Sequence, residues 1–312
     1  MIRRQLGRTG LQIHPLVLGG NVFGWTADEA TSFRILDAFV EGGGNCIDTA
    51  DAYSAWVPGH RGGESETVIG NWLARRGRRD DVVLATKVGW EVAPDRKGLR
   101  RDYILRSVED SLRRLRTDYI DLYFSHRDDL SLGVEEPLRA HEQLLRDGKV
   151  RCIGASNFTA ARLREALSVR DLPRYQVLQP HYNLLERTEF ETELSSVCVA
   201  EGLGVVTYFS LASGYLTGKY RSSQDLAGSA RMMMAGRYLA GRGPSVLAAL
   251  DAVAAETAAS PAQVALAWLL ARPAVTAPIA SATSVTQLAE IMGATTLCLS
   301  DGQMARLAAC GI

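Results

Sequence analysis

Short apolar runs rich in Val, Ile and Leu alternate with helical stretches along most of the chain, and this alternation restricts the possible folds more than any other feature. The apolar runs predict eight strands, at residues 16–19, 45–48, 82–86, 122–125, 152–155, 177–179, 205–208 and 277–279. The helical patterns predict helices at residues 28–41, 64–76, 101–115, 134–146, 159–168, 189–201, 261–271 and 284–292. Eight parallel strands linked by right-handed helical crossovers close most naturally into a (β/α)8 TIM barrel. The carboxyl ends of the strands are therefore where we expect the chemistry.

Four further segments lie outside this alternation. Residues 2–6 and 11–14, with a glycine-bounded turn between them, predict an N-terminal β-hairpin that we expect to cover the closed end of the barrel. Residues 245–257 and 300–309 predict extra helices. No Ser-, Pro- or Gly-rich linker interrupts the chain, so we expect a single domain over residues 1–312.

The composition restricts the possible partners. Lys plus Arg and Asp plus Glu number 35 each, so the chain has no basic excess for a phosphate backbone and we expect no nucleic-acid partner. The longest apolar stretches, such as residues 264–270, are much shorter than the roughly 20 residues that span a bilayer, and the first residues lead into no apolar signal core. We therefore expect a cytoplasmic protein without a membrane partner. Five cysteines without a Cys-x-x-Cys pair and five scattered histidines predict reduced, mostly buried thiols and no metal site.

Four polar side chains occur where the second, third and fourth predicted strands end. Asp48 ends the second strand and Tyr53 follows it, whereas Lys87 follows the third strand and His126 the fourth. Each residue alone is compatible with ordinary packing or capping, but together they suit the delivery of a proton to a carbonyl group. A lysine ammonium next to a phenol is expected to lower the phenol's pKa from about 10, with Asp48 as the counter-ion of the lysine. A neutral His126 can donate a hydrogen bond that orients the carbonyl oxygen.

Several motifs, in order along nearly the whole chain, carry a resemblance to a known family. They are Gly44-x-x-x-Asp48-Thr49-Ala50-x-x-Tyr53, Ser65-Glu66-x-x-Ile69-Gly70, Ala85-Thr86-Lys87, residues 118–123 before His126, residues 148–157, Gln179-Pro180-His181-Tyr182-Asn183, and residues 211–220. In these motifs the sequence resembles the aldo-keto reductase superfamily. The resemblance implies a (β/α)8 oxidoreductase that binds NADPH, or less often NADH, and reduces the carbonyl of an aldehyde or ketone. It also implies a catalytic tetrad of Asp48, Tyr53, Lys87 and His126, with Tyr53 as the general acid.

The resemblance further implies which residues contact the cofactor. Side chains like Ser156, Asn157 and Gln179 hydrogen-bond the nicotinamide carboxamide in the family, and a ring like Tyr208 stacks on the nicotinamide. The segment after the seventh strand runs along the pyrophosphate, and Arg231 lies in a region that often adds a contact. The expected cofactor contacts are Gly20, Asn21, Asp48, Ser156, Asn157, Gln179, Tyr208, Phe209, Ser210, Leu211, Ala212, Gly214, Lys219, Arg231, Ser281, Thr283, Gln287 and Glu290.

The sequence departs from the family pattern in two places. Many members read Tyr-Ser-Pro-Leu where this chain has residues 208–211, Tyr-Phe-Ser-Leu. At the adenosine end, Ser281 replaces a common Gly, Thr283 stands where a cation is often found, and Ile291 replaces an Asn. A missing Lys or Arg there removes a charge-assisted hydrogen bond to the 2′-phosphate, worth roughly 1.5–3 kcal/mol. NADPH is still the expected cofactor because Ser281, Thr283 and Ser284 can donate hydrogen bonds.

The substrate pocket is expected among aromatic residues near the strand ends. These are Phe23, Trp25, Trp56 and Trp90, and the alternative for each is packing within its loop. Residues 232–234, three consecutive methionines in a long connection, are either packed or part of an adaptable lid. Sugars and keto-sugars are among the candidate substrates, and the protein is expected to be a monomer or a homo-oligomer.

Two rival functions remain open. Some members of the family are regulatory partners of ion channels, so a non-catalytic subunit that senses the nicotinamide cofactor is the main alternative. A barrel glycosidase would need two carboxylates about 5–9.5 Å apart across the mouth. Asp48 is better explained as the counter-ion of Lys87, and no second carboxylate ends the fourth or seventh strand.

Overall fold

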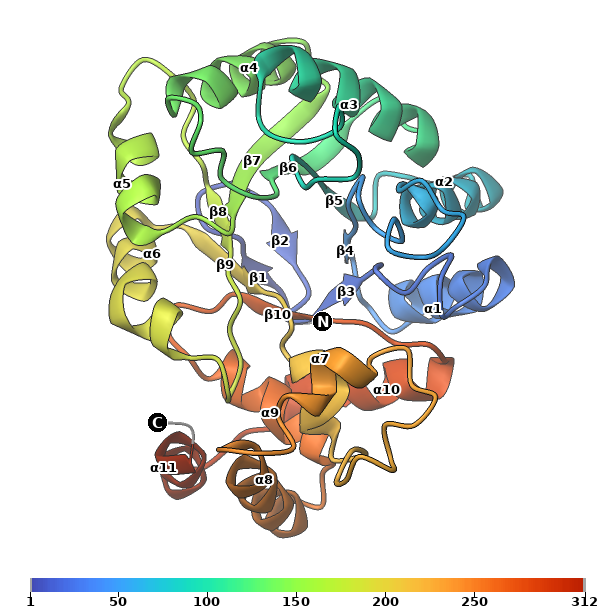
Figure 1. Cartoon of the computed structure of the whole chain (residues 1–312), viewed down its shortest axis with the longest axis vertical. Helices are drawn as coiled ribbons and strands as arrows, with labels where there is room; N and C mark the ends of the chain where they lie inside the picture. Colours follow the sequence, from blue (N-terminus) through green and yellow to red (C-terminus); the bar gives the residue numbers. More distant parts are fainter. Residues whose placement is uncertain (1, 311–312) are drawn as a thin grey trace.

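The computed structural model describes residues 2–310, and its centre is a closed barrel of eight parallel strands (Figure 1). The barrel strands are β3 (Val17–Gly19), β4 (Cys46–Asp48), β5 (Val83–Val88), β6 (Ile120–Ser125), β7 (Val150–Ser156), β8 (Val177–Gln179), β9 (Gly204–Thr207) and β10 (Ala277–Ala280). Each strand pairs with the next one along the chain, and β10 pairs with β3 to close the barrel. All eight predicted strands are confirmed.

Helices surround the barrel and connect its strands (Figure 1). They are α1 (Glu29–Glu41), α2 (Glu64–Arg76), α3 (Arg101–Leu115), α4 (Glu135–Arg146), α5 (Ala160–Ser168), α6 (Ser195–Glu201), α9 (Pro261–Leu270) and α10 (Val285–Gly293). Several begin at a side-chain cap: the Ser260 hydroxyl accepts the Gln263 N–H while the Gln263 side chain accepts the Ser260 N–H. The predicted helices are confirmed, except that residues 189–201 form a π-helical turn, η1 (Phe190–Leu194), before α6.

The N-terminal hairpin closes the amino end of the barrel. Strands β1 (Arg4–Gln5) and β2 (Gln12–Ile13) pair antiparallel, and Leu6 and Ile13 are fully buried against the first inward-facing residues of the barrel strands. Gly7 has a φ of +54°, and a Cβ there would lie 2.3 Å from the Gly204 nitrogen, so no larger residue fits this contact. The prediction that the hairpin covers the closed end is confirmed, and the opposite end carries the site.

Two extra helices lie outside the ring, as predicted. They are α8 (Gly243–Thr257), which packs on α9, and α11 (Asp301–Cys310), which packs on α8 (Figure 1). Three short elements were not predicted: η2 (Ala212–Thr217), α7 (Met232–Gly236) and η3 (Ala294–Thr296).

Within residues 2–310, no helix combines the length and the apolar character needed to cross a membrane. Of the five free cysteines, Cys46, Cys152 and Cys198 are buried.

A buried polar cluster behind β6 gives the fold a specific pH dependence. His141 of α4 is fully buried, and its Nε2 lies 3.0 Å from the Ser125 hydroxyl, which in turn lies 2.8 Å from the Tyr175 hydroxyl. Burial lowers the pKa of His141 to about 4, against about 6.5 in the unfolded chain. Between these values the unfolded chain binds more protons than the folded one, so stability falls as the pH falls.

We expect this one group to remove roughly 3 kcal/mol of the free energy of unfolding when the pH falls from above 6.5 to 4. The measurement is denaturant unfolding at several pH values for the wild type and for His141→Gln, because the difference between them isolates this histidine from the other titrating groups. Parallel pH profiles for the two proteins would contradict the prediction.

Candidate active site

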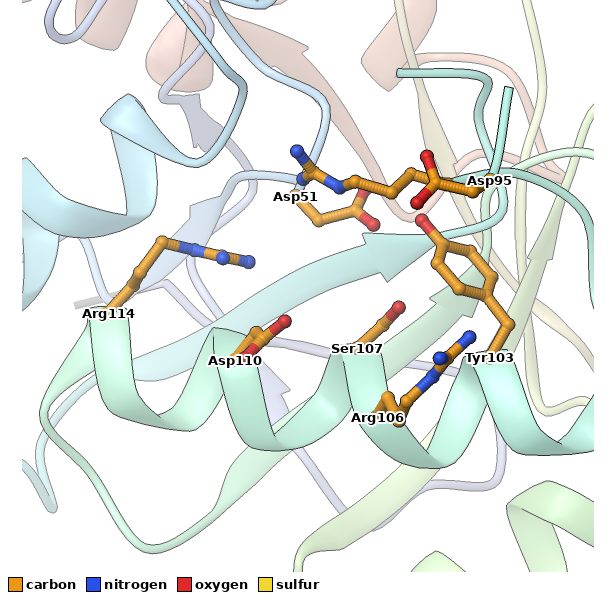
Figure 2. Close-up of a pocket in the computed structure, with 8 residues that line it drawn as sticks. Asp51, Asp95, Tyr103, Arg106, Ser107, Asp110 and Arg114 are labelled. Atoms are coloured by element: carbon orange, nitrogen blue, oxygen red, sulfur yellow. The ribbon is translucent and has the colours of Figure 1, made fainter. Parts of the chain in front are cut away.

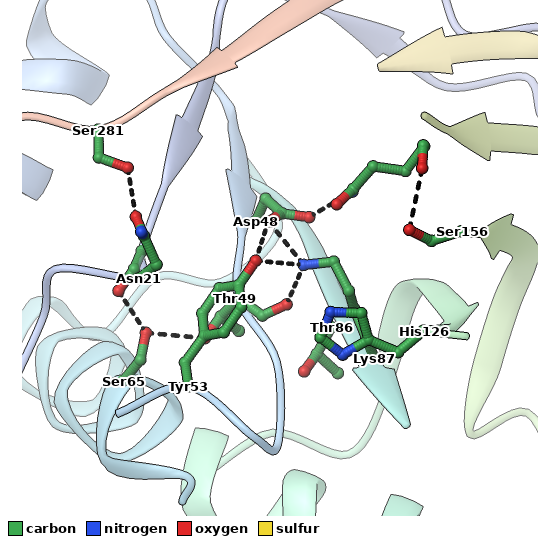
Figure 3. A network of polar contacts seen from close by, with 12 residues as sticks. Asn21, Asp48, Thr49, Tyr53, Ser65, Thr86, Lys87, His126, Ser156 and Ser281 are labelled. Carbon is green, nitrogen blue, oxygen red and sulfur yellow. Dashed lines mark hydrogen bonds and ion pairs between the residues drawn. The ribbon is translucent and has the colours of Figure 1, made fainter. Parts of the chain in front are cut away.

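Three side chains, two from neighbouring strands and one from a loop, meet at the open end of the barrel (Figure 3). Asp48 is the last residue of β4, Tyr53 lies in the loop that follows, and Lys87 is the fifth residue of β5. The Lys87 ammonium donates to Asp48 Oδ2 at 2.7 Å, to Tyr53 Oη at 2.8 Å and to the Thr49 carbonyl at 2.7 Å. The Tyr53 hydroxyl donates to the same Asp48 oxygen at 3.1 Å. The pairing of β4 with β5 therefore places a phenol between an ammonium and a carboxylate.

The electrostatics of this group differ from the sequence-based expectation. Burial raises the pKa of Tyr53 well above its usual value, and Asp48 adds to the rise through its charge and through the hydrogen bond it accepts. Burial also lowers the pKa of Lys87, which Asp48 partly opposes. The prediction that Lys87 lowers the Tyr53 pKa is therefore wrong, because loss of solvent and the nearby carboxylate outweigh the lysine. Tyr53 consequently holds its proton at neutral pH.

His126 follows β6 and lies beside the phenol. Its ring centroid is 6.1 Å from that of Tyr53 in an edge-on arrangement, and 5.2 Å from that of Trp90. Its Nδ1 is buried without a hydrogen-bond partner, and burial, with a smaller contribution from Lys87, lowers the pKa of the imidazole well below its usual value. A neutral imidazole therefore stands next to the phenol that carries the proton.

Polar groups from β7 and β8 continue the network across the barrel. Gln179, the last residue of β8, donates from Nε2 to Asp48 Oδ1 at 2.8 Å. The Ser156 hydroxyl donates to the Gln179 carbonyl at 2.9 Å, and Asn157 donates to Ser156 at 3.1 Å. The Tyr208 hydroxyl donates to Asn157 Oδ1 at 2.7 Å. Amide and hydroxyl groups thus form one chain of hydrogen bonds that ends at the Asp48 carboxylate.

The comparisons with known proteins agree with this arrangement. The family model described as Aldo/keto reductase family matches residues 15–312. The chain belongs to the aldo/keto reductase family. The resemblance predicted from the motifs is thereby confirmed, and the protein is an oxidoreductase with the (β/α)8 barrel of that family.

Three relatives illustrate the range of the family. The uncharacterized oxidoreductase YrpG of Bacillus subtilis (strain 168) is 39% identical over 97% of this chain and 93% of its own length. The probable voltage-gated potassium channel subunit beta of Oryza sativa subsp. japonica is 35% identical over 93% of this chain and 90% of its own. Norsolorinic acid reductase of Aspergillus flavus is 34% identical over 72% of this chain and 59% of its own. Aldo/keto reductases generally use nicotinamide cofactors and act on small carbonyl substrates.

The segment after β9 was expected to follow the pyrophosphate of the cofactor. Its backbone is left-handed at Ala212, Ser213 and Gly214, and the N–H groups of Ala212 and Gly214 bond within the turn. A Cβ on Gly214 would lie 3.5 Å from Lys219 Cε, so the exposed lysine lies against this turn. Lys219 is therefore the group of this segment best suited to a phosphate. Ser210 is buried and its hydroxyl donates to the Thr207 carbonyl at 2.8 Å, which makes it a structural residue of the turn.

Tyr208 and Phe209 lie just before this turn. The Tyr208 ring stacks on His181 with centroids 5.1 Å apart and planes 18° apart, which restricts its orientation. Phe209 adopts a φ of +50°, and its carbonyl accepts a hydrogen bond from the Asn183 side chain at 2.9 Å. The stacked rings of His181 and Tyr208 form an aromatic wall next to Asn157.

The residues expected at the adenosine end lie together before and within α10. The Ser281 hydroxyl donates to Asn21 Oδ1 at 2.5 Å, and both the N–H and the hydroxyl of Thr283 donate to Gln287 Oε1. These donors thus already bond neighbouring side chains, and a bound adenosine phosphate would have to replace those hydrogen bonds.

Two further residues were expected to contact the cofactor. Glu290 lies further along α10 and is exposed. Leu211 is half-buried at the start of η2.

The end of β3 is tied to the tetrad through the backbone. The Gly20 N–H donates to the Asp48 carbonyl at 2.7 Å, and the Gly20 carbonyl accepts from the Ser65 hydroxyl at 2.7 Å. A Cβ on Gly20 would lie 2.9 Å from the Ser65 oxygen, so glycine keeps this approach open. Gly20 and Asn21 therefore connect the Asp48 strand end with Ser281.

Three of the four predicted pocket aromatics lie at the opening. Trp56 and Trp90 are 51% and 41% exposed, and Trp25 packs edge-on against Trp56 at 5.3 Å. Phe23 is fully buried and therefore does not line the opening. The Arg231 guanidinium lies 5.6 Å from the Trp25 ring centroid, which brings the long connection after β9 to the same opening.

The methionine run is exposed and therefore not packed: Met232, Met233 and Met234 are 45%, 91% and 40% exposed.

The sequence did not predict two groups close to the tetrad. The Thr49 carbonyl binds Lys87, which no side-chain pattern signals. Asp51 is buried in the loop between Asp48 and Tyr53, and its only sequence signal was an acidic residue close to a strand end.

Proposed function

We propose that this aldo/keto reductase reduces the carbonyl group of an aldehyde or ketone with NADPH, and that Tyr53 donates the proton. The observation that carries the proposal is the position of the Tyr53 hydroxyl, within hydrogen-bond distance of both members of a buried Lys87–Asp48 ion pair. A raised pKa keeps the phenol protonated, as a general acid requires, and Lys87 stabilises the charge that remains when the proton leaves. A bound nicotinamide would supply the hydride.

The roles of the other polar residues follow from their contacts. His126, neutral and beside Tyr53, would hydrogen-bond the carbonyl oxygen and orient it toward Tyr53. Ser156, Asn157 and Gln179 offer the hydroxyl and amide groups that suit a carboxamide, and Tyr208 offers a ring for stacking. Lys219 and Arg231 would bind phosphate groups, since cations form the stronger, charge-assisted hydrogen bonds to phosphate.

The opening suggests where the substrate binds. Trp25, Trp56 and Trp90 surround the side of Tyr53 and His126 from which a carbonyl would approach. Their apolar faces favour a substrate whose carbonyl carries an apolar or aromatic group. Sugars and keto-sugars also remain candidates, because the indole rings can stack on a sugar ring.

The test combines binding and turnover. We expect fluorescence titration of the purified protein to give tighter binding for NADPH than for NADH, and cofactor absorbance to fall when aldehydes, ketones or keto-sugars are added.

A second candidate function, a non-catalytic subunit that senses the cofactor, is favoured by the relative named as a potassium channel subunit. NADPH binding without turnover on any carbonyl would favour that candidate, and no binding of either nucleotide would contradict both.

His126→Ala tests the carbonyl-orienting role. Loss of one preorganised donor to a developing oxyanion costs about 10²- to 10³-fold in kcat, so we expect a loss of that size together with a changed order of preference among substrates. The affinity for NADPH should stay nearly the same, because the role is assigned to the carbonyl oxygen alone. Unaltered kinetics across several substrates would rule the role out.

A further inference from the structure

A second cavity lies between α3 and the loop after β4, and the tetrad residues do not line it (Figure 2). Its volume is about 170 Å³, close to the ~150 Å³ of an engineered cavity that holds one benzene molecule. Along its wall, Tyr103, Ser107 and Arg106 project from one face of α3 toward the loop that carries Asp51 (Figure 2). The size suits a compound of roughly six to nine non-hydrogen atoms.

The lining of the cavity includes a buried carboxyl group, one oxygen of which has no hydrogen-bond partner. Asp51 is 2% exposed, and its Oδ1 makes no hydrogen bond. Burial, reinforced by the nearby Glu66, raises the pKa of Asp51 to about 8. A buried polar atom without a partner costs about 1–3 kcal/mol, so a ligand that hydrogen-bonds Asp51 would recover that free energy.

The lining also carries guanidinium groups. Arg106 is 68% exposed, and its nearest carboxylate, that of Asp102, is 3.7 Å away. Arg96 uses one nitrogen to bind the Arg61 carbonyl at 2.9 Å and also lines the cavity. Arg114 differs from both, because it is already paired with the buried Glu66 at 2.6 Å. Arg96 and Arg106 are therefore the guanidinium groups of the lining suited to an anion.

Other charges restrict what this anion can be. Asp95 and Asp110 also line the cavity and would repel a ligand with several negative charges. Residues 2–310 contain no cluster of three His, Cys, Asp or Glu side chains placed to hold a metal ion. The lining thus favours a small ligand with one negative charge at one end and a hydrogen-bond donor at the other.

We propose that this cavity binds a small carboxylate that also carries a hydroxyl or ammonium group. The carboxylate contacts Arg96 and Arg106, and the hydroxyl or ammonium group hydrogen-bonds the free Asp51 oxygen. Tyr103 and Ser107 also line the cavity. None of the four tetrad residues lines the cavity, so the proposal does not depend on the reaction assigned to Tyr53.

The test is calorimetric titration of the full chain with D-glycerate and L-serine, each of which has both groups. Acetate, which lacks the donor, and glycerol, which lacks the carboxylate, are the comparison ligands. We expect at least one of the two complete ligands to bind about tenfold or more tightly than both comparison ligands, because each end contributes a hydrogen bond to a charged or buried group. No measurable binding at millimolar concentrations, or equal affinity for acetate, would overturn the proposal.

Variants locate the binding. Arg106→Ala should weaken it about tenfold or more, and the exposure of Arg106 means that the fold does not depend on this side chain. Asp51→Leu should weaken it similarly, with thermal unfolding as a check that the protein is folded. Arg139→Ala, which removes an exposed arginine of α4, is the matched control and should bind like the wild type.

Tyr53→Phe should also bind like the wild type. Binding that is lost in Tyr53→Phe but kept in Arg106→Ala would place the ligand in the barrel opening, and it would overturn the proposal without affecting the proposed reaction.

Discussion

Replacing Tyr53 with Phe should lower kcat by about 10²- to 10⁴-fold, the usual contribution of a positioned general acid. The variant keeps the aromatic ring, which lies edge-on to Trp56 at 6.2 Å and under the Lys87 ammonium at 4.6 Å from its centroid. Only the hydroxyl is lost, so the shape of the opening should be unchanged. Steady-state turnover with a carbonyl substrate measures the effect.

Cofactor affinity is the control for this variant. The groups proposed to hold the cofactor, from Ser156 through Lys219, do not include the Tyr53 hydroxyl, so the dissociation constant for NADPH should be nearly that of the wild type. This result would separate a lost proton donor from a damaged binding site. Turnover retained at the wild-type rate would mean that another group delivers the proton.

Lys87→Met should destabilise the protein and abolish turnover. Lys87 is fully buried, Asp48 is 2% exposed, and their charged atoms are 2.7 Å apart. Breaking a buried ion pair by removing one partner costs about 3–5 kcal/mol, because the remaining charge is left uncompensated. Asp48 keeps its hydrogen bonds from Gln179 and Tyr53, so we expect a value near the lower end of that range. Denaturant unfolding measures the change in the free energy of unfolding.

The double variant Asp48→Asn with Lys87→Met is the matched control. It leaves no uncompensated charge, and it should recover most of the lost stability while remaining inactive. Such a result would show that the two charges are needed for the reaction and are not a requirement of the fold. A single variant as stable as the wild type would instead mean that Asp48 does not depend on Lys87 for compensation.

The sequence predicted the barrel and the tetrad for the same physical reason. Apolar periodicity and helix-capping residues are local properties, so the strands and helices could be placed from neighbouring residues alone. In a closed parallel barrel all strands end on the same side. Asp48, Lys87 and His126 were therefore expected at one rim as soon as their strands were placed.

The interactions within the site were harder to predict. Gln179 bonds Asp48 across 131 residues of sequence, and no local pattern signals that contact. The Tyr53 pKa was predicted in the wrong direction because its value depends on how much water the surrounding loops exclude. The adenosine-end donors Ser281 and Thr283 were expected to donate hydrogen bonds to the cofactor, and in the structure each donates to a neighbouring side chain.

The sequence by itself determined the order of the elements, the closed barrel, the hairpin at its amino end and the residue types at the strand ends. Only the tertiary structure decided which of those residues lose their water and which keep it. It buried Phe23, exposed Met233 and left one oxygen of Asp51 without a hydrogen bond beside a cavity. The physical reason is that burial is a sum over contacts from distant segments, whereas periodicity and capping depend on residues a few positions apart.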